Sequence, residues 1–134
     1  MPSETILVVD DDAAVLEYCR SVLAQEGYHV LPASNGPEAL AICGRGERID
    51  MALVDVIMPG MPGIELVKRL EALAPSPKVA LISGYTPDEV SKLIGADGSN
   101  YRIFWKPYDL RVFLQMVRNV LDRPRREIAA YARP

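Results

Sequence analysis

Four short apolar runs in this sequence end in residue types that can do chemistry. Acids follow two of the runs, a serine follows another, and a lysine follows the last: Asp10 and Asp11, Asp55, Ser83 and Lys106. A single acid in such a place commonly caps the helix that comes next. Capping alone is a poor explanation for four distant segments that carry complementary side chains, so we expect these residues to converge on one site.

The chemistry that suits this set is phosphoryl transfer. Three neighbouring carboxylates repel one another unless a cation lies among them. Mg²⁺ prefers such hard oxygen ligands and bridges protein carboxylates to phosphate oxygens. An aspartate that attacks phosphorus benefits from this metal because the incoming phosphoryl oxygens are negative. A hydroxyl and an ammonium group would complete the cage around those oxygens, so that positioning and charge stabilisation would suffice without a dedicated acid–base pair.

The apolar runs themselves predict the strands of a parallel sheet. Three of them are continuously apolar, which is typical of central strands covered on both faces. Two further runs are mixed and contain Pro32 or Arg102, which favours edge positions. The predicted central strands are 5–9, 51–54 and 79–82, and the predicted edge strands are 28–33 and 101–105.

Helical patterns follow each predicted strand. They cover 12–27, 38–43, 63–73, 87–94 and a final stripe formed by Leu110, Phe113, Met116, Val117, Val120 and Leu121. Five alternations of strand and helix predict an α/β fold, a doubly wound parallel sheet with helices on both faces. The placing of central and edge strands fits the flavodoxin-like (βα)5 order 2-1-3-4-5. Ligands of such sheets bind at the carboxyl ends of the strands, where the polar residues stand.

Composition limits the class of protein. The chain has 134 residues, enough for one domain, and no apolar stretch approaches the ~20 residues of a membrane helix. Because the first residues also lack a signal-peptide layout, we expect a cytoplasmic protein with no membrane partner. The net charge of −3, with −5 in residues 1–121, argues against nucleic-acid binding. Cys19 and Cys43 are predicted to be reduced core residues, and neither they nor His29 form a metal motif.

Four sequence blocks together resemble the receiver domains of bacterial two-component response regulators. The blocks are ILVVDDD, ALVDVIMPGMPGIEL, LISG and FWKPYDL, and the resemblance covers about residues 4–121 in the right order. It implies that Asp55 is the phosphoacceptor, that Ser83 hydrogen-bonds the phosphoryl group, and that Lys106 is its cationic partner. It also implies a cis Lys106–Pro107 bond.

The resemblance further implies a Mg²⁺ site. Asp11 and Asp55 would bind the ion directly, Asp10 mainly through water, and Ile57 through its backbone carbonyl. Gly63 matches a common position of the family to which we assign no chemical role. The chain departs from the family at Ile103, where an aromatic switch residue usually stands.

By the same resemblance, a histidine kinase or histidine phosphotransfer protein donates a phosphoryl group to Asp55, and the altered surface changes partner binding. The domain would assist its own phosphotransfer and autodephosphorylation without being a turnover enzyme. We expect a receiver domain over residues 1–121 and a short basic tail over 122–134. The sequence leaves open a stand-alone regulator or a module of a hybrid kinase, and homodimerisation through the last helix–strand–helix face.

Three other interpretations fit less well. A small aspartyl-phosphate phosphohydrolase, resembling haloacid-dehalogenase-like phosphatases, would use Asp10 as its nucleophile. The chain lacks their cap domain and later acid pair, and Asp55 would have no role. A flavodoxin relative is disfavoured because the acids would repel the flavin phosphate. The complete set of acids, hydroxyl and lysine argues against a module that only binds partners.

Overall fold

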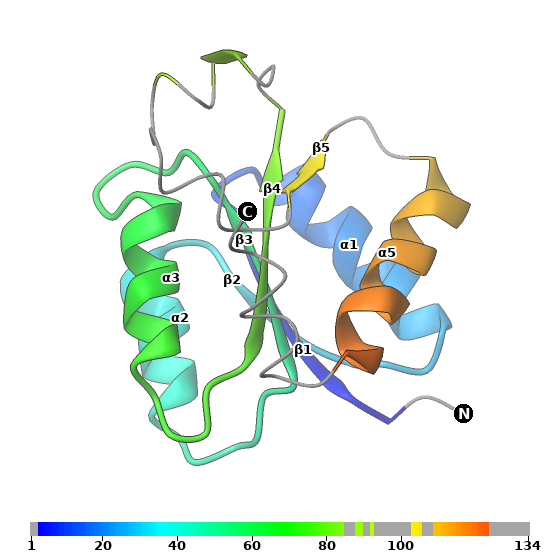
Figure 1. The fold of residues 1–134 in the computed structure, drawn as a ribbon, viewed down its shortest axis with the longest axis horizontal. Coiled ribbons are helices and arrows are strands. Elements are labelled where there is room, and N and C mark those ends of the chain that lie inside the picture. Colours follow the sequence, from blue (N-terminus) through cyan, green and yellow to red (C-terminus); the bar gives the residue numbers. More distant parts are fainter. Residues whose placement is uncertain (1–2, 85–87, 90–91, 93–102, 106–108, 124–134) are drawn as a thin grey trace.

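Five parallel strands form one sheet in the order β2-β1-β3-β4-β5 in the computed structural model (Figure 1). The model describes residues 3–84, 88–89, 92, 103–105 and 109–123. The predicted order is confirmed, and β2 and β5 are the edge strands, as their mixed composition indicated. The strands are β1 Thr5–Val9, β2 His29–Ala33, β3 Met51–Asp55, β4 Lys78–Ser83 and β5 Ile103–Trp105.

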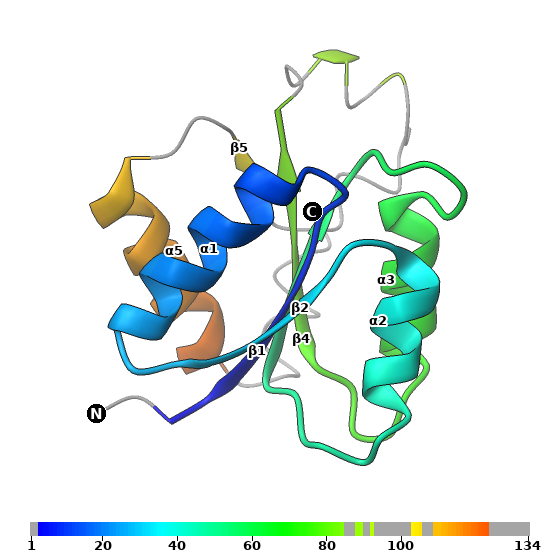
Figure 2. The same ribbon diagram turned by 180° about the vertical axis from the view of Figure 1, so that it is seen from behind.

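Helices cover both faces of the sheet. Figures 1 and 2 show α1 Ala13–Gln25 and α5 Leu110–Asp122 on one face, and α2 Gly36–Cys43 and α3 Gly63–Glu71 on the other. The helix predicted over 87–94 lies largely outside the described residues. None of the helices in the described part of the chain is both long and apolar enough to cross a membrane.

The central strands are apolar at every position because both of their faces are buried. In β1, Ile6 and Val8 pack toward α1 and α5, whereas Leu7 and Val9 pack toward α2 and α3. All four side chains are fully buried. Burial of each such side chain contributes about 1.5–3 kcal/mol relative to exposure, so the two core layers stabilise the sheet from both sides.

Helix boundaries follow local capping, and several differ from the prediction. Helix α2 begins at Gly36, two residues early, because the Asn35 side chain accepts a hydrogen bond from the Glu38 N–H at 2.8 Å and Pro37 suits a first turn. Helix α3 ends at Glu71 in place of residue 73. Leu110 is not a core residue: it is 46% exposed because it opens α5, ahead of the first buried turn.

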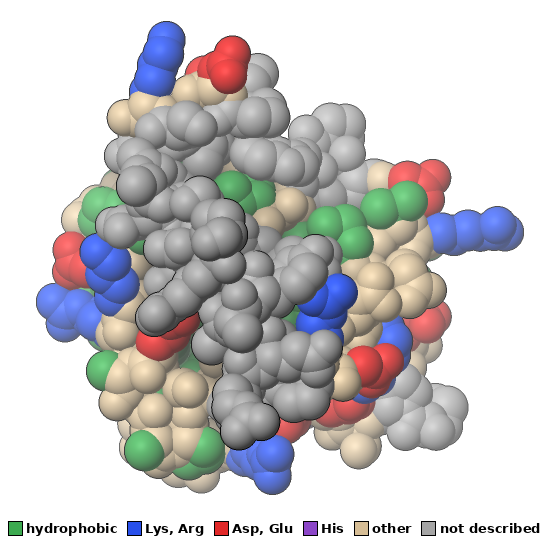
Figure 3. Space-filling view, in the orientation of Figure 1, with side chains coloured by type: hydrophobic (Ala, Val, Ile, Leu, Met, Phe, Trp, Pro, Cys, Tyr) green, Lys and Arg blue, Asp and Glu red, His purple; other side chains and the backbone are tan. Residues whose placement is uncertain are grey.

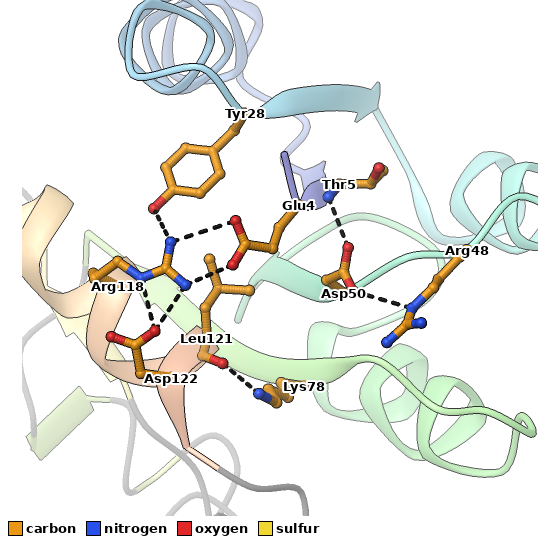
Figure 4. A network of polar contacts seen from close by, with 9 residues as sticks. All are labelled: Glu4, Thr5, Tyr28, Arg48, Asp50, Lys78, Arg118, Leu121 and Asp122. Atoms are coloured by element: carbon orange, nitrogen blue, oxygen red, sulfur yellow. Dashed lines mark hydrogen bonds and ion pairs between the residues drawn. The ribbon is translucent and has the colours of Figure 1, made fainter. Parts of the chain in front are cut away.

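A polar network fixes the carboxyl end of α5 at the rim formed by the amino ends of the strands (Figure 4). The Arg118 guanidinium bonds Glu4 at 2.6 Å, the Asp122 carboxylate at 2.8 Å and the Tyr28 hydroxyl at 3.2 Å. These bonds, first that to Glu4, raise the pKa of Arg118, and the bond from Arg118 lowers the pKa of Glu4. Burial raises the pKa of the Tyr28 hydroxyl.

Two further contacts at this rim join strands to other elements. The Lys78 ammonium at the start of β4 donates to the backbone carbonyl of Leu121 in α5. The Asp50 carboxylate accepts the Thr5 N–H at 2.9 Å and so joins the chain before β3 to the start of β1 (Figure 4). The amino-end rim is thus held by contacts that link residues far apart in the sequence.

Neither cysteine forms a disulfide within the described residues, and only Cys19 lies in the core as predicted. Cys19 is buried and Cys43 is half-buried. Burial raises the pKa of the Cys43 thiol, which keeps it protonated and unreactive at neutral pH.

The Arg118 network predicts a pH-dependent contribution to stability. The pKa of Glu4 is below its usual value of 4.5 in the folded protein. Its ion pair therefore stabilises the fold above that pH, and this contribution is lost as the pH falls through the lowered pKa. We expect Glu4→Gln to reduce the free energy of unfolding by about 1 kcal/mol at neutral pH, less as the solution is acidified.

Urea unfolding over a range of pH checks this prediction. Glu17→Gln is the matched control, since Glu17 pairs with Arg20 on the exposed side of the same helix, α1. A Glu4→Gln deficit that stayed constant with pH would contradict the assignment of the effect to the Glu4 charge.

Candidate functional site

Three acids meet at the carboxyl ends of the central strands. Strands β1 and β3 pair in parallel with Val9 opposite Val54, so the residues that follow, Asp10 and Asp55, emerge side by side. Carboxylate oxygens of Asp10, Asp11 and Asp55 all lie within 4.8 Å of one another. The convergence predicted from the sequence is therefore present for the acids.

The turn after β1 holds Asp10 in place. Asp10 is fully buried, and its Oδ1 accepts the Asp12 N–H at 2.8 Å while its own N–H donates to the Ala33 carbonyl at 3.1 Å. Asp12 points into helix α1 as its N-cap, since its carboxylate accepts the Ala14 N–H at 2.9 Å. Consecutive acids thus have different roles: Asp12 caps the helix, and Asp11 is the exposed member of the cluster.

Asp55 is the last residue of β3 and is only 6% exposed. Its Oδ1 accepts the Ile57 N–H at a long 3.4 Å. The Ile57 side chain packs against the core on the α2 and α3 face, so the backbone is the part of this residue that can serve a polar site. Asp55 also pairs with Ile82 of β4, the residue before Ser83.

Ser83 is fully buried at the end of β4, on the same rim and one strand away from Asp55. Ser83 in turn pairs with Trp105, the last residue of β5, and Lys106 comes next in the chain. Lys106 and the predicted cis Lys106–Pro107 bond lie outside the described residues. The sheet register therefore accounts for the place of Ser83, and the lysine stays a prediction.

The departure at Ile103 has a structural counterpart. Ile103 is half-buried and packs toward the α2 and α3 face, whereas Phe104 is fully buried on the opposite face. The Phe104 ring meets the Phe113 ring of α5 edge-on, with 6.0 Å between centroids. Phe104 is thus a packing residue that joins β5 to α5, while Tyr101 lies outside the described residues.

The donor set fits a divalent cation with a preference for oxygen. Each of the three acids offers a carboxylate oxygen, and the exposed Asp11 gives access from solvent. Carboxylates with open positions for water and phosphate oxygens are the ligands that Mg²⁺ uses. This set can hold such an ion, and Asp55 is close enough to share it.

Gly63 is a neighbour of the site that the sequence analysis left without a role. Its N–H donates to the Val56 carbonyl at 3.0 Å, which ties the start of α3 to the residue after Asp55. A glycine at the first position of a helix, where better helix formers are available, was the signal that might have drawn attention to a close backbone contact.

Comparisons with known proteins agree with this geometry. The family model of the response regulator receiver domain matches residues 6–118. Sporulation initiation phosphotransferase F of Bacillus subtilis (strain 168) is 34% identical over 124 residues, which cover 90% of this chain and 96% of that protein. A receiver domain crystal structure from Methanospirillum hungatei JF-1 is 33% identical, with a TM-score of 0.74 over 90% of this chain and 95% of that one.

Other relatives are much longer than this chain. Sensor kinase CckA of Brucella abortus (strain 2308) is 33% identical over 122 residues, which are 90% of this chain but 13% of that protein. The chain spans about half, or less, of the length of several further curated relatives. The family model matches this chain from the first strand into the last helix. The chain therefore belongs to the response regulator receiver domains of two-component signal transduction.

Proposed function

We propose that the protein accepts a phosphoryl group on Asp55 in a Mg²⁺-dependent reaction and thereby switches its affinity for a partner. The observation that carries the proposal is the meeting of Asp10, Asp11 and Asp55 oxygens within 4.8 Å, at the rim where Ser83 also ends its strand. In a receiver domain, this arrangement supports Asp55 as the phosphoacceptor.

Asp11, Asp55 and the Ile57 carbonyl would hold Mg²⁺, with Asp10 acting mainly through water. Bound Mg²⁺ supplies positive charge that offsets the repulsion between the carboxylates and the phosphoryl oxygens. An Asp55 oxygen attacks phosphorus, so the new oxygen–phosphorus bond forms as the nitrogen–phosphorus bond of the donor phosphohistidine breaks. The bonding electrons leave with the imidazole, whose other ring nitrogen carries a proton, so the donor histidine departs in its neutral form.

Ser83 and Lys106 would bind the transferred group. The Ser83 hydroxyl donates a hydrogen bond to a phosphoryl oxygen, and the Lys106 ammonium pairs with another. Water hydrolyses the acyl phosphate later, so the domain assists its own phosphorylation and dephosphorylation and is not a turnover enzyme. Burial of Ser83 and Asp55 supports a site in which these hydrogen bonds are shielded from solvent.

The phosphodonor would be a histidine kinase or a histidine phosphotransfer protein. Relatives named as a phosphotransferase and as a sensor kinase support both a stand-alone regulator and a module of a hybrid kinase. We place the receiver domain in residues 1–121, followed by a basic tail over 122–134, and we place the protein in the cytoplasm.

The surface charge supports a protein partner in place of a nucleic acid. Figure 3 shows Lys and Arg side chains interspersed with Asp and Glu side chains over the described part of this face. The net charge of the chain is −3. A nucleic-acid surface would instead need clustered cations that displace counterions from phosphates.

Labelling with acetyl phosphate tests the phosphoacceptor. In the presence of Mg²⁺ the wild-type chain should gain one phosphoryl group, seen by intact-protein mass spectrometry, and Asp55→Asn should gain none because its amide is not a nucleophile. EDTA should abolish the labelling. Label retained in Asp55→Asn and lost in Asp10→Asn would contradict the proposal and favour the phosphohydrolase alternative.

Mg²⁺ affinity tests the metal ligands. Asp11→Asn should weaken Mg²⁺ binding at least about tenfold, measured by titration of amide chemical shifts. Asp12→Asn is the matched control: it removes the same charge one residue away, and Asn caps α1 as well as Asp does. The wild-type fold should gain about 2.7 kcal/mol at a free Mg²⁺ concentration of about 100 times Kd. Equal weakening in both variants would show that only the net charge matters.

A further inference from the structure

The first residue of helix α3 packs directly on the backbone of the proposed phosphoacceptor. A Cβ atom placed on Gly63 would overlap the carbonyl oxygen of Asp55, and it would lie 2.9 Å from the Asp55 carbonyl carbon and 3.0 Å from the Val56 Cα. Real Cβ atoms essentially never approach backbone atoms so closely. Gly63 is thus required here for its lack of a side chain.

The backbone on the far side of this contact has little freedom to retreat. Strand β3 is hydrogen-bonded between β1 and β4, with Asp55 opposite Ile82. The next residue, Val56, donates its N–H to the Ile82 carbonyl at 3.0 Å. A displacement of the Asp55 backbone would therefore disturb a paired strand in the middle of the sheet.

Helix α3 is held equally firmly on its own side. Leu66, Val67 and Leu70 are fully buried in the core layer between α3 and the sheet. Moving the helix outward would open a gap in that layer, at a cost in lost packing contacts. A side chain at residue 63 would thus strain the one strand that ends in the phosphoacceptor.

Gly36 provides an instructive contrast. A Cβ atom there would lie 2.5 Å from the Met61 sulfur and 3.0 Å from the Met61 Cβ. The crowded group is mainly a flexible side chain, which can turn away by changing rotamer. At Gly63 the crowded atoms are backbone, so the strain cannot be relieved by a rotamer change.

We propose that Gly63 is a positioning residue for the acidic site. The close packing of α3 on the Asp55 backbone keeps the Asp55 carboxylate near those of Asp10 and Asp11. This inference rests on the proposed function of Asp55. Gly63 makes no contact with the reacting atoms in this role, and it acts through the backbone of the residue that does. The same contact fixes the start of the loop that carries Ile57, because the Gly63 N–H donates a hydrogen bond to the Val56 carbonyl.

Replacement of Gly63 by alanine tests the inference. We expect Gly63→Ala to fold, to shift the amide resonances of Asp10, Asp55 and Val56 in the metal-free protein, and to weaken Mg²⁺ binding about 10- to 100-fold. Gly44→Ala is the matched glycine control, because among the described residues beyond its chain neighbours the nearest atom to a Cβ there would be the Ala41 carbonyl oxygen, at 3.5 Å. It should keep the wild-type Mg²⁺ affinity.

A second control separates positioning from general stability. Leu70→Ala removes a buried side chain near the other end of α3 and should lower the midpoint of urea unfolding while Mg²⁺ affinity stays at the wild-type value. Wild-type Mg²⁺ affinity in Gly63→Ala would overturn the inference. So would an equal loss of affinity in Leu70→Ala, or a Gly63→Ala chain that does not fold, which would assign the glycine to folding.

The wild-type protein separates this inference from the proposed function. Failure of the wild type to bind Mg²⁺ or to accept a phosphoryl group from acetyl phosphate would refute the proposed function, whatever the variants do. A wild type that does both, beside a Gly63→Ala variant that binds Mg²⁺ equally well, would refute only the role of Gly63.

Discussion

Negative charges held close together are the constraint on which the rest of this structure depends. Three carboxylates share a space in which their oxygens lie within 4.8 Å, and two of them, Asp10 and Asp55, are almost fully buried. Free side chains of like charge would move apart. Here their backbones belong to the ends of paired strands, and the apolar layers on both faces of the sheet supply the free energy that keeps them there.

The two rims of the sheet differ in how their charges are arranged. At the amino ends of the strands, Arg118 lies between Glu4 and Asp122, so charges of opposite sign meet and hold α5 to the sheet. At the carboxyl ends, like charges meet, and Lys106, the predicted cationic partner of the phosphoryl group, lies outside the described residues. A rim that stabilises the fold on one side allows the other rim to keep a geometry that suits a ligand more than it suits the unliganded protein.

Local patterns in the sequence were sufficient to predict most of the fold and the meeting of the three acids. Continuous apolar runs identify β1, β3 and β4, and an acid stands where each of the first two runs ends. Contacts between residues far apart in the sequence leave no such local pattern. Arg118 and Glu4 are 114 residues apart, and either could have been an ordinary surface charge. Leu110 fits the helical stripe, yet it is exposed. The stripe does not show where a helix leaves the core.

The close seat of Gly63 shows why the site is harder to predict than the fold. The proposed role of Gly63 depends on an absent side chain and on a backbone carbonyl in another element, neither of which has a periodic signature.

The backbone that holds each acid explains the order of exposure among the three acids. Asp10 is fixed by the turn and Asp55 by the strand, and both are buried, whereas Asp11 is exposed to solvent. Rigid backbone thus fixes two of the acids in place, and the third lies open to solvent, as the proposed Mg²⁺-dependent reaction requires.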